Sequence, residues 1–183
     1  SVFIQASSYP ASATRSAPAV CMQDGQPAWK FDGVGTHLAL PSGVIPRRAG
    51  YTLSMEVRPE NAAGQQLLLA NRSHTLGTLA LLLDNGVLKG AFLRDNAQTV
   101  QLDTGLALPP GRWSTVQVGY DLSNLVIRVN EQTRTAACPG PGRYDTPTVV
   151  GGFEKSWFRG LIRNIRVRHG VATAPGGQKA AEF

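Results

Sequence analysis

The last third of the chain contains a segment, FRGLIRNIRVRH, in which basic and apolar side chains alternate. Its arginines are Arg159, Arg163, Arg166 and Arg168. With a bulge near Asn164, the apolar Ile162, Ile165 and Val167 fall on one face of a β-strand and the arginines on the other. We expect a row of guanidinium groups, each of which can hold a sulfate or carboxylate in a planar, bidentate fork. The alternative is that the segment is an outer strand whose charges only prevent strand-to-strand aggregation, because such a strand has the same pattern.

Trp157 lies just before this segment, in the loop FEKSW. A loop tryptophan either packs as an anchor over one end of the fold or presents its ring to a sugar or a partner. The loop ANRSHTLG contributes Arg72 and His74. We therefore predict a ligand site at a loop end around Trp157, Arg72 and His74. The arginine row would assist it, and Arg128 and Arg134 on neighbouring strands would add to the row.

Acidic and nucleophilic patterns give little support to catalysis. A retaining glycosidase needs two carboxyl groups about 5 Å apart. No glutamate has an acidic neighbour two or three positions away, and Pro59 separates the nearest pair, Glu56 and Glu60. The histidines are scattered, and no G-x-S-x-G nucleophile motif occurs. The sequence therefore predicts a protein that is not an enzyme.

The chain has two cysteines, Cys21 and Cys138, without the C-x-x-C spacing of a metal clip. In an oxidising compartment they could form a disulfide that closes a long segment. Two unrelated thiols are the alternative. We take the disulfide Cys21–Cys138 as an expectation for the structure to test.

Composition and periodicity indicate an all-β domain. The 183 residues have a net charge of +6, which favours acidic partners, but no nucleic-acid-binding motif is present. No apolar run reaches the roughly 18 residues of a membrane span. Period-two segments such as YTLSMEVRP and NLVIRVN recur, and Asn85-Gly86 predicts a tight hairpin. We expect a two-sheet antiparallel sandwich over residues 21–170, an extended connector over 1–20 and a tail over 171–183.

The order of these segments resembles the laminin G-like domain of the concanavalin A-like jelly-roll group. The pieces that match, from Phe31 to His169, are FDG, TLSMEVRP, GQQLLL, LALLLDNGVL, LPPGRWSTVQVGYDLSNLVIRVN, VVGG and FRGLIRNIRV. The resemblance implies a jelly-roll sandwich used for extracellular recognition, in a secreted or cell-surface protein. Within the pattern, Trp113 is expected to fill the core behind a turn at Gly111.

Many members of this family hold one calcium ion at the rim of the sandwich. The two positions that correspond to its carboxylates fall near Thr78 and at Asp145, so only one carboxylate is present. Calcium prefers six to eight oxygen ligands, and we therefore predict no family-type calcium site and no cofactor. The alternative is a calcium site in a shifted register, with Asp95 and Asp103 in or near the neighbouring loops as its carboxylates.

Together these features predict a non-catalytic module that binds glycan or polysaccharide, with acidic ones among the candidates. The alternative is a protein–protein adhesion or assembly domain of a larger cell-surface or phage-tail protein. A glycoside hydrolase or polysaccharide lyase of the concanavalin A-like group is a weaker alternative.

Overall fold

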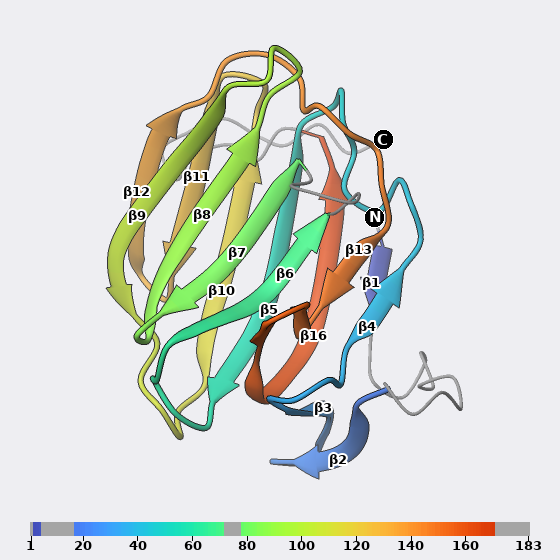
Figure 1. Ribbon diagram of the computed structural model, residues 1–183, viewed down its shortest axis with the longest axis vertical. Coiled ribbons are helices and arrows are strands. Elements are labelled where there is room, and N and C mark those ends of the chain that lie inside the picture. The colour runs from blue at the N-terminus through green and yellow to red at the C-terminus, as the bar shows by residue number, and fades with distance from the viewer. Residues whose placement is uncertain (1, 5–16, 72–77, 171–183) are drawn as a thin grey trace.

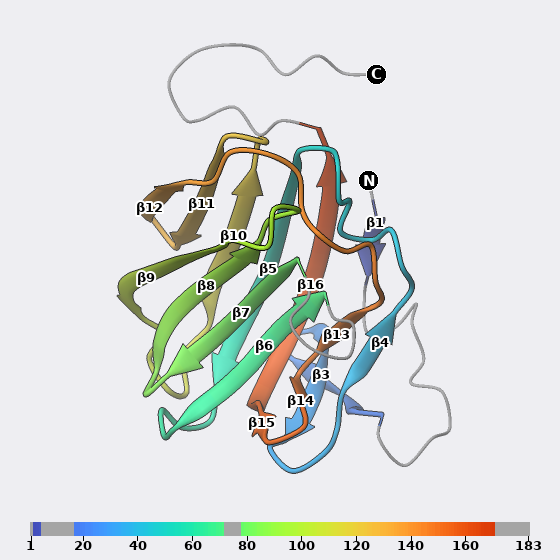
Figure 2. The ribbon, with the colours of Figure 1, turned by 45° about the horizontal axis from the view of Figure 1, so that its top comes forward.

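Two antiparallel β-sheets lie face to face in the computed structural model, which describes residues 2–4, 17–71 and 78–170 (Figures 1 and 2). The predicted all-β sandwich is therefore confirmed. No helix among the described residues is long and apolar enough to cross a membrane.

The larger sheet has eight strands in the order β12-β11-β10-β5-β16-β3-β2, and β1 also pairs with β16. β16 thus lies between β5 on one side and both β3 and β1 on the other. The strands are β1 (Val2–Ile4), β2 (Ala19–Gln23), β3 (Gln26–Asp32), β5 (Tyr51–Pro59), β10 (Ser114–Tyr120), β11 (Asn124–Val129), β12 (Gln132–Ala137) and β16 (Arg159–His169).

The smaller sheet has six strands in the order β4-β13-β6-β7-β8-β9. A two-stranded sheet, β14-β15, lies beside β6. These strands are β4 (Leu38–Leu40), β6 (Gln65–Asn71), β7 (Leu79–Asp84), β8 (Val87–Leu93), β9 (Thr99–Ala107), β13 (Thr148–Val150), β14 (Gly152–Phe153) and β15 (Ser156–Trp157).

The core between the sheets follows the alternation of the sequence. On β5, Leu53, Met55 and Val57 are 0–1% exposed, whereas the residues between them are half-buried on the outer face. The hairpin that joins β7 to β8 turns at Asn85 and Gly86, with φ angles of 48° and 81°. Positive φ at both positions is the geometry of a type I′ turn, so this prediction is confirmed.

Trp113 does not fill the core, contrary to expectation. The tryptophan buried between the sheets is Trp29, which is 0% exposed, while Trp113 is half-buried. Trp113 immediately precedes β10, and its ring lies beside Arg163, an outward-pointing residue of β16. The glycine turn before it therefore directs the indole onto the outside of the larger sheet.

The ends of the larger sheet contain strands that the sequence did not signal. β12 has no apolar alternation, because nearly all of its residues are exposed. β1 and the start of β2 lie inside the segment expected to be a connector, residues 1–20. The predicted tail, 171–183, lies outside the described residues.

The expected disulfide is wrong, since Cys21 and Cys138 are both free thiols. Cys21 lies on β2 and Cys138 directly follows β12, and these strands are the two ends of the larger sheet (Figure 1). Six strand spacings amount to roughly 29 Å, far beyond the 7 Å or so that a disulfide allows between Cα atoms. Burial raises the pKa of the Cys138 thiol to about 11.

Candidate functional site on the outer face of the larger sheet

A bulge in β16 sets the direction of its side chains. The pairing with β5 shifts between Arg163 and Arg166, and Asn164 has a φ of 54°. The extra residue keeps Ile162 and Ile165 in the core, as predicted, and both are 0% exposed. All the arginines of β16 consequently point to the outer face of the larger sheet, but they do not have the same surroundings.

Arg163 is not an exposed member of a row. It is 7% exposed, and its guanidinium forms an ion pair with Glu56 on β5 at 3.1 Å. Its Nη1 donates to the backbone oxygen of Gln23 at 3.0 Å, and the ring of Trp113 lies 4.1 Å from the guanidinium carbon. Asn164 also donates to Glu56. These contacts occupy Arg163 within the fold, which corrects the expectation that it faces solvent.

Arg159, at the start of β16, is about half exposed and pairs with Glu60 at 3.0 Å. The carboxylates that came closest to a catalytic pair, Glu56 and Glu60, thus each have an arginine partner of their own. Next to Arg159, Gly160 has a φ of 149°, and a Cβ there would lie 2.4 Å from the backbone oxygen of Arg58. Only glycine lets the strand pass this close to β5.

Arg166 and Arg168, beyond the bulge, are both exposed. Arg166 pairs in register with Ser54, Ser54 with Gln117, and Gln117 with Arg128, so a polar line crosses β16, β5, β10 and β11. A shallow hollow of about 260 Å³ lies on this line. Its lining residues are Ser54, Met55, Glu56, Thr115, Gln117, Asn164 and Arg166.

Of the neighbouring arginines, Arg128 joins the outer face and Arg134 does not. Arg128 pairs with Glu131 at 2.6 Å, which offsets part of its charge. Arg134 lies opposite Ile127 on β11, and Ile127 is a buried core residue. Because paired residues of antiparallel strands point to the same side, Arg134 points away from the outer face.

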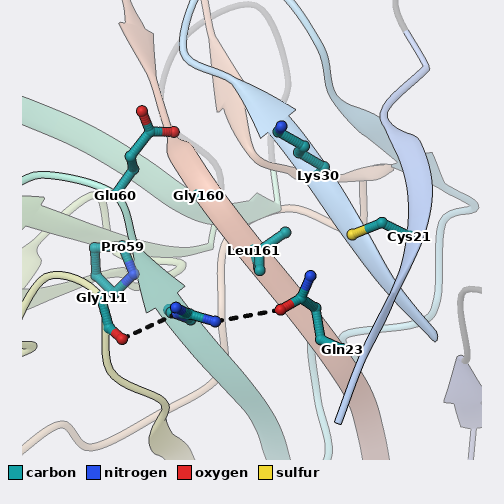
Figure 3. Close-up of a pocket in the computed structure, with 9 residues that line it drawn as sticks. Cys21, Gln23, Lys30, Pro59, Glu60, Gly111, Gly160 and Leu161 are labelled. Atoms are coloured by element: carbon teal, nitrogen blue, oxygen red, sulfur yellow. Dashed lines mark hydrogen bonds between the residues drawn. The ribbon is translucent and has the colours of Figure 1, made fainter. Parts of the chain in front are cut away.

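A second hollow, of about 350 Å³, lies at the other end of the same face (Figure 3). It spans β2, β3, the start of β16 and the end of β5. Its lining residues are Cys21, Gln23, Lys30, Arg58, Pro59, Glu60, Gly111, Gly160 and Leu161. Lys30 and Arg58 lie on different strands, and the order of β3, β16 and β5 in the sheet brings them to one pocket.

Trp157 is half-buried on β15 and packs against Gly152. A Cβ atom at Gly152 would lie 2.4 Å from Cε3 of Trp157. Its ring centroid is 5.9 Å from that of His37. The segment Gly151–Phe158 is hydrogen-bonded to β6 at Leu68, in the middle of that strand, and β6 ends at Asn71. Arg72 and His74 themselves lie outside the described residues, so the loop-end site stays a prediction.

The two positions that would hold calcium in this family lie together but are used internally. The Thr78 hydroxyl donates to the backbone oxygen of Tyr144 at 2.7 Å. Asp145 accepts the backbone N–H of Gly43 at 2.9 Å. One engaged hydroxyl and one engaged carboxylate do not fit a cation that needs six to eight oxygens. In the described ranges, no three His, Cys, Asp or Glu side chains group closely enough to hold a metal ion.

Asp32 fixes the turn that follows β3, beside the start of β16. Its carboxylate accepts the backbone N–H groups of Val34 at 2.8 Å, Gly35 at 3.0 Å and Thr36 at 3.1 Å. The hydrogen bond from Val34, reinforced by the other two, lowers the pKa of Asp32 to about 2. Arg159 lies opposite Asp32 in the β3–β16 register, so this turn is at the end of the sheet that holds the 350 Å³ hollow.

Comparison with known proteins agrees with the fold. Residues 32–175 match a laminin G family model described as the concanavalin A-like lectin/glucanases superfamily. Mouse usherin is 26% identical over 157 residues, which is 78% of this chain but 3% of usherin.

Solved structures show the same architecture. Domains LG4-5 of the mouse laminin α1 chain superpose with a TM-score of 0.63 at 22% identity, over 75% of this chain and 40% of that one. Domain 4 of AbnA, a GH43 extracellular arabinanase from Geobacillus stearothermophilus, superposes with a TM-score of 0.64 at 15% identity. That match covers 94% of this chain and 83% of the AbnA domain, whose structure is a complex with arabinotriose. Identities this low establish the fold alone.

Proposed function

Because this chain belongs to the concanavalin A-like lectin/glucanase superfamily and has a laminin G-like fold, we propose that it is a non-catalytic recognition module. Its ligands in this proposal are glycans or polysaccharides, with a preference for acidic ones. Laminin G-like domains are typically non-catalytic, although the superfamily also contains glucanases. The pairing of Glu56 and Glu60 with separate arginines supports a non-catalytic role, because a retaining glycosidase needs two carboxyl groups that face each other about 5 Å apart.

The observation that carries the proposal is the polar line across the larger sheet. Arg166 and Arg168 are exposed at one side of it, and Ser54, Gln117 and Thr115 supply hydroxyl and amide groups in the adjoining hollow. Hydroxyl-rich ligands need this mixture of donors and acceptors on a surface set by rigid strands. The guanidinium groups add attraction for sulfates and carboxylates.

The comparisons give independent support of a weaker kind. AbnA domain 4, which shares this fold, is described in complex with an arabinose trisaccharide. Usherin and laminin, to which the chain is similar, are extracellular, which is consistent with a secreted or cell-surface location. Because the chain spans only a small part of usherin and less than half of the laminin fragment, the activity of its parent protein is part of the proposal.

A second candidate, a protein-contact module, is favoured by one feature of the sheet edge. β2 is an outermost strand of the larger sheet, and Val20 and Met22 on it are 45% and 64% exposed. An exposed edge strand with apolar side chains can pair with a strand of another protein.

Titration against neutral and acidic oligosaccharides at low and high salt tests the first proposal. We expect acidic ligands to bind, with an affinity that falls as salt rises. The double variant Arg166→Ala/Arg168→Ala should lose about tenfold in affinity at low salt. Arg134→Ala is the control for the loss of one positive charge, because its side chain points to the other side of the sheet. If no glycan binds, the proposal is overturned in favour of the protein-contact module.

A further inference from the structure

The hollow formed by β2, β3, β5 and β16 has a composition of its own, distinct from the polar line beyond the bulge. Its volume of about 350 Å³ lies within the range of small-molecule sites, roughly 300–1,000 Å³. Figure 3 shows Lys30 and Leu161 on neighbouring strands, with Glu60 and Gly111 across from them.

Two cationic side chains flank the apolar floor of this hollow. Leu161 is the register partner of Lys30 on β3 and of Arg58 on β5, so the three form one line across adjacent strands. Lys30 is exposed, and no described residue forms an ion pair or hydrogen bond with its ammonium group. With strands about 4.8 Å apart, both side chains can reach an anionic group placed above Leu161.

Arg58 is held in position before any ligand arrives. Its Nε donates to the backbone oxygen of Gly111 at 3.0 Å and its Nη1 to Gln23 Oε1 at 3.2 Å. Within the described part of the chain, Nη2 makes no hydrogen bond. A guanidinium fixed on one edge with its other nitrogen available loses little conformational entropy when it binds an anion.

The negative charge at the margin does not cancel these cations. Glu60 lines the hollow but forms an ion pair with Arg159, which lies outside the lining. Neither Lys30 nor Arg58 forms an ion pair with any residue that the structure describes. Below them, Leu161, Pro59 and the backbone of Gly160 offer an apolar floor to the C–H face of a ring.

We infer that this hollow is a binding subsite for a single sugar acid, a hexuronate unit, whose carboxylate contacts Lys30 and Arg58 while its ring packs on Leu161 and Pro59. The inference rests on the proposed function in taking the sugar as part of a glycan. A neutral hexose would leave both cations without a counter-charge. A sulfate ester shares the anionic chemistry, so the experiment must separate carboxylate from sulfate.

The test uses D-glucuronate, D-glucose and glucose 6-sulfate as probes of the whole chain by NMR. Glucuronate should shift the Leu161 methyl signals, and glucose should not. Lys30→Gln should weaken glucuronate binding about tenfold, and it leaves the packing intact because Lys30 is exposed. Lys155→Gln, in the turn between β14 and β15, removes the same charge elsewhere and should have no effect. Equal binding of glucose, or stronger binding of the sulfate, would overturn the assignment.

Cys21 provides a second readout that does not depend on NMR. Its half-buried thiol lines the hollow, so bound glucuronate should slow its alkylation by iodoacetamide. Cys138 is the internal reference, because it is 0% exposed and its raised pKa keeps it protonated. If glucuronate leaves the Cys21 rate unchanged while acidic polymers still bind through Arg166 and Arg168, the subsite is wrong and the proposed function stands.

Discussion

The two halves of β16 have similar residues but different outer faces. Before the bulge, Arg159 and Arg163 each pair with a glutamate, and Arg163 is enclosed by Glu56, Trp113 and the end of β2. After the bulge, Arg166 and Arg168 are exposed. The difference shows that neighbouring strands decide how deeply each arginine of one strand is buried, since Arg163 is enclosed whereas Arg166 and Arg168 stay at the surface.

The comparison is tested most strongly by removing one arginine from each half. Arg163→Ala leaves Glu56 without its ion pair in a mostly buried site and removes the cation above Trp113. Breaking such a pair should lower the free energy of unfolding by about 2–3 kcal/mol, below the full value for a buried pair because the Glu56 side chain is 28% exposed. Arg168→Ala should change it by less than about 0.5 kcal/mol. Urea titration of both variants measures the difference, and similar losses would mean that the two halves are alike.

The bulge that separates the halves is the next target. Asn164→Val puts a β-branched side chain at a φ of 54° and removes the hydrogen bonds to Glu56 and Gln26. We expect a loss of about 2 kcal/mol. Asn164→Gly keeps the left-handed backbone without strain and loses only the hydrogen bonds, which should cost about 1 kcal/mol. If thermal unfolding gives both variants the same loss, the lost hydrogen bonds and not the backbone angle account for it.

Sequence alone predicted the elements that depend on local chemistry. The alternation of Leu53, Met55 and Val57 and the hairpin at Asn85-Gly86 require only neighbouring residues, and the bulge at Asn164 was signalled by the two-residue gap between Ile162 and Ile165. The ordered motifs then identified the family.

The surroundings of each charge were not predictable in the same way. Pairing of Arg163 with Glu56 joins residues more than a hundred positions apart, and only the β5–β16 register brings them together. The approach of Trp113 to the outer face depends on the turn before β10. The separation of Cys21 from Cys138 likewise follows from strand order, which alternation along one strand does not specify.

The smallest expected effect concerns the turn beside the start of β16. Asp32 has a pKa of about 2 in the folded chain, below the roughly 3.9 of an unfolded aspartate. Its ionised form therefore stabilises the fold above about pH 4, and this contribution disappears as the pH falls from 4 through 2. Because the carboxylate is exposed and screened, Asp32→Ala should cost less than about 1 kcal/mol at pH 7.

The pH dependence of the free energy of unfolding distinguishes the hydrogen bonds of the Asp32 carboxylate from a general effect of its charge. Unfolding of Asp32→Ala and the unsubstituted chain should differ at pH 7 and converge near pH 2. Asp95→Ala is the control, because the Asp95 carboxylate accepts no hydrogen bond from any described residue. The change in unfolding free energy caused by Asp95→Ala should be small and should not show the pH dependence expected for Asp32→Ala. If the free energy of unfolding differs by the same amount between Asp32→Ala and the unsubstituted chain at all pH values, the turn does not depend on the ionised carboxylate.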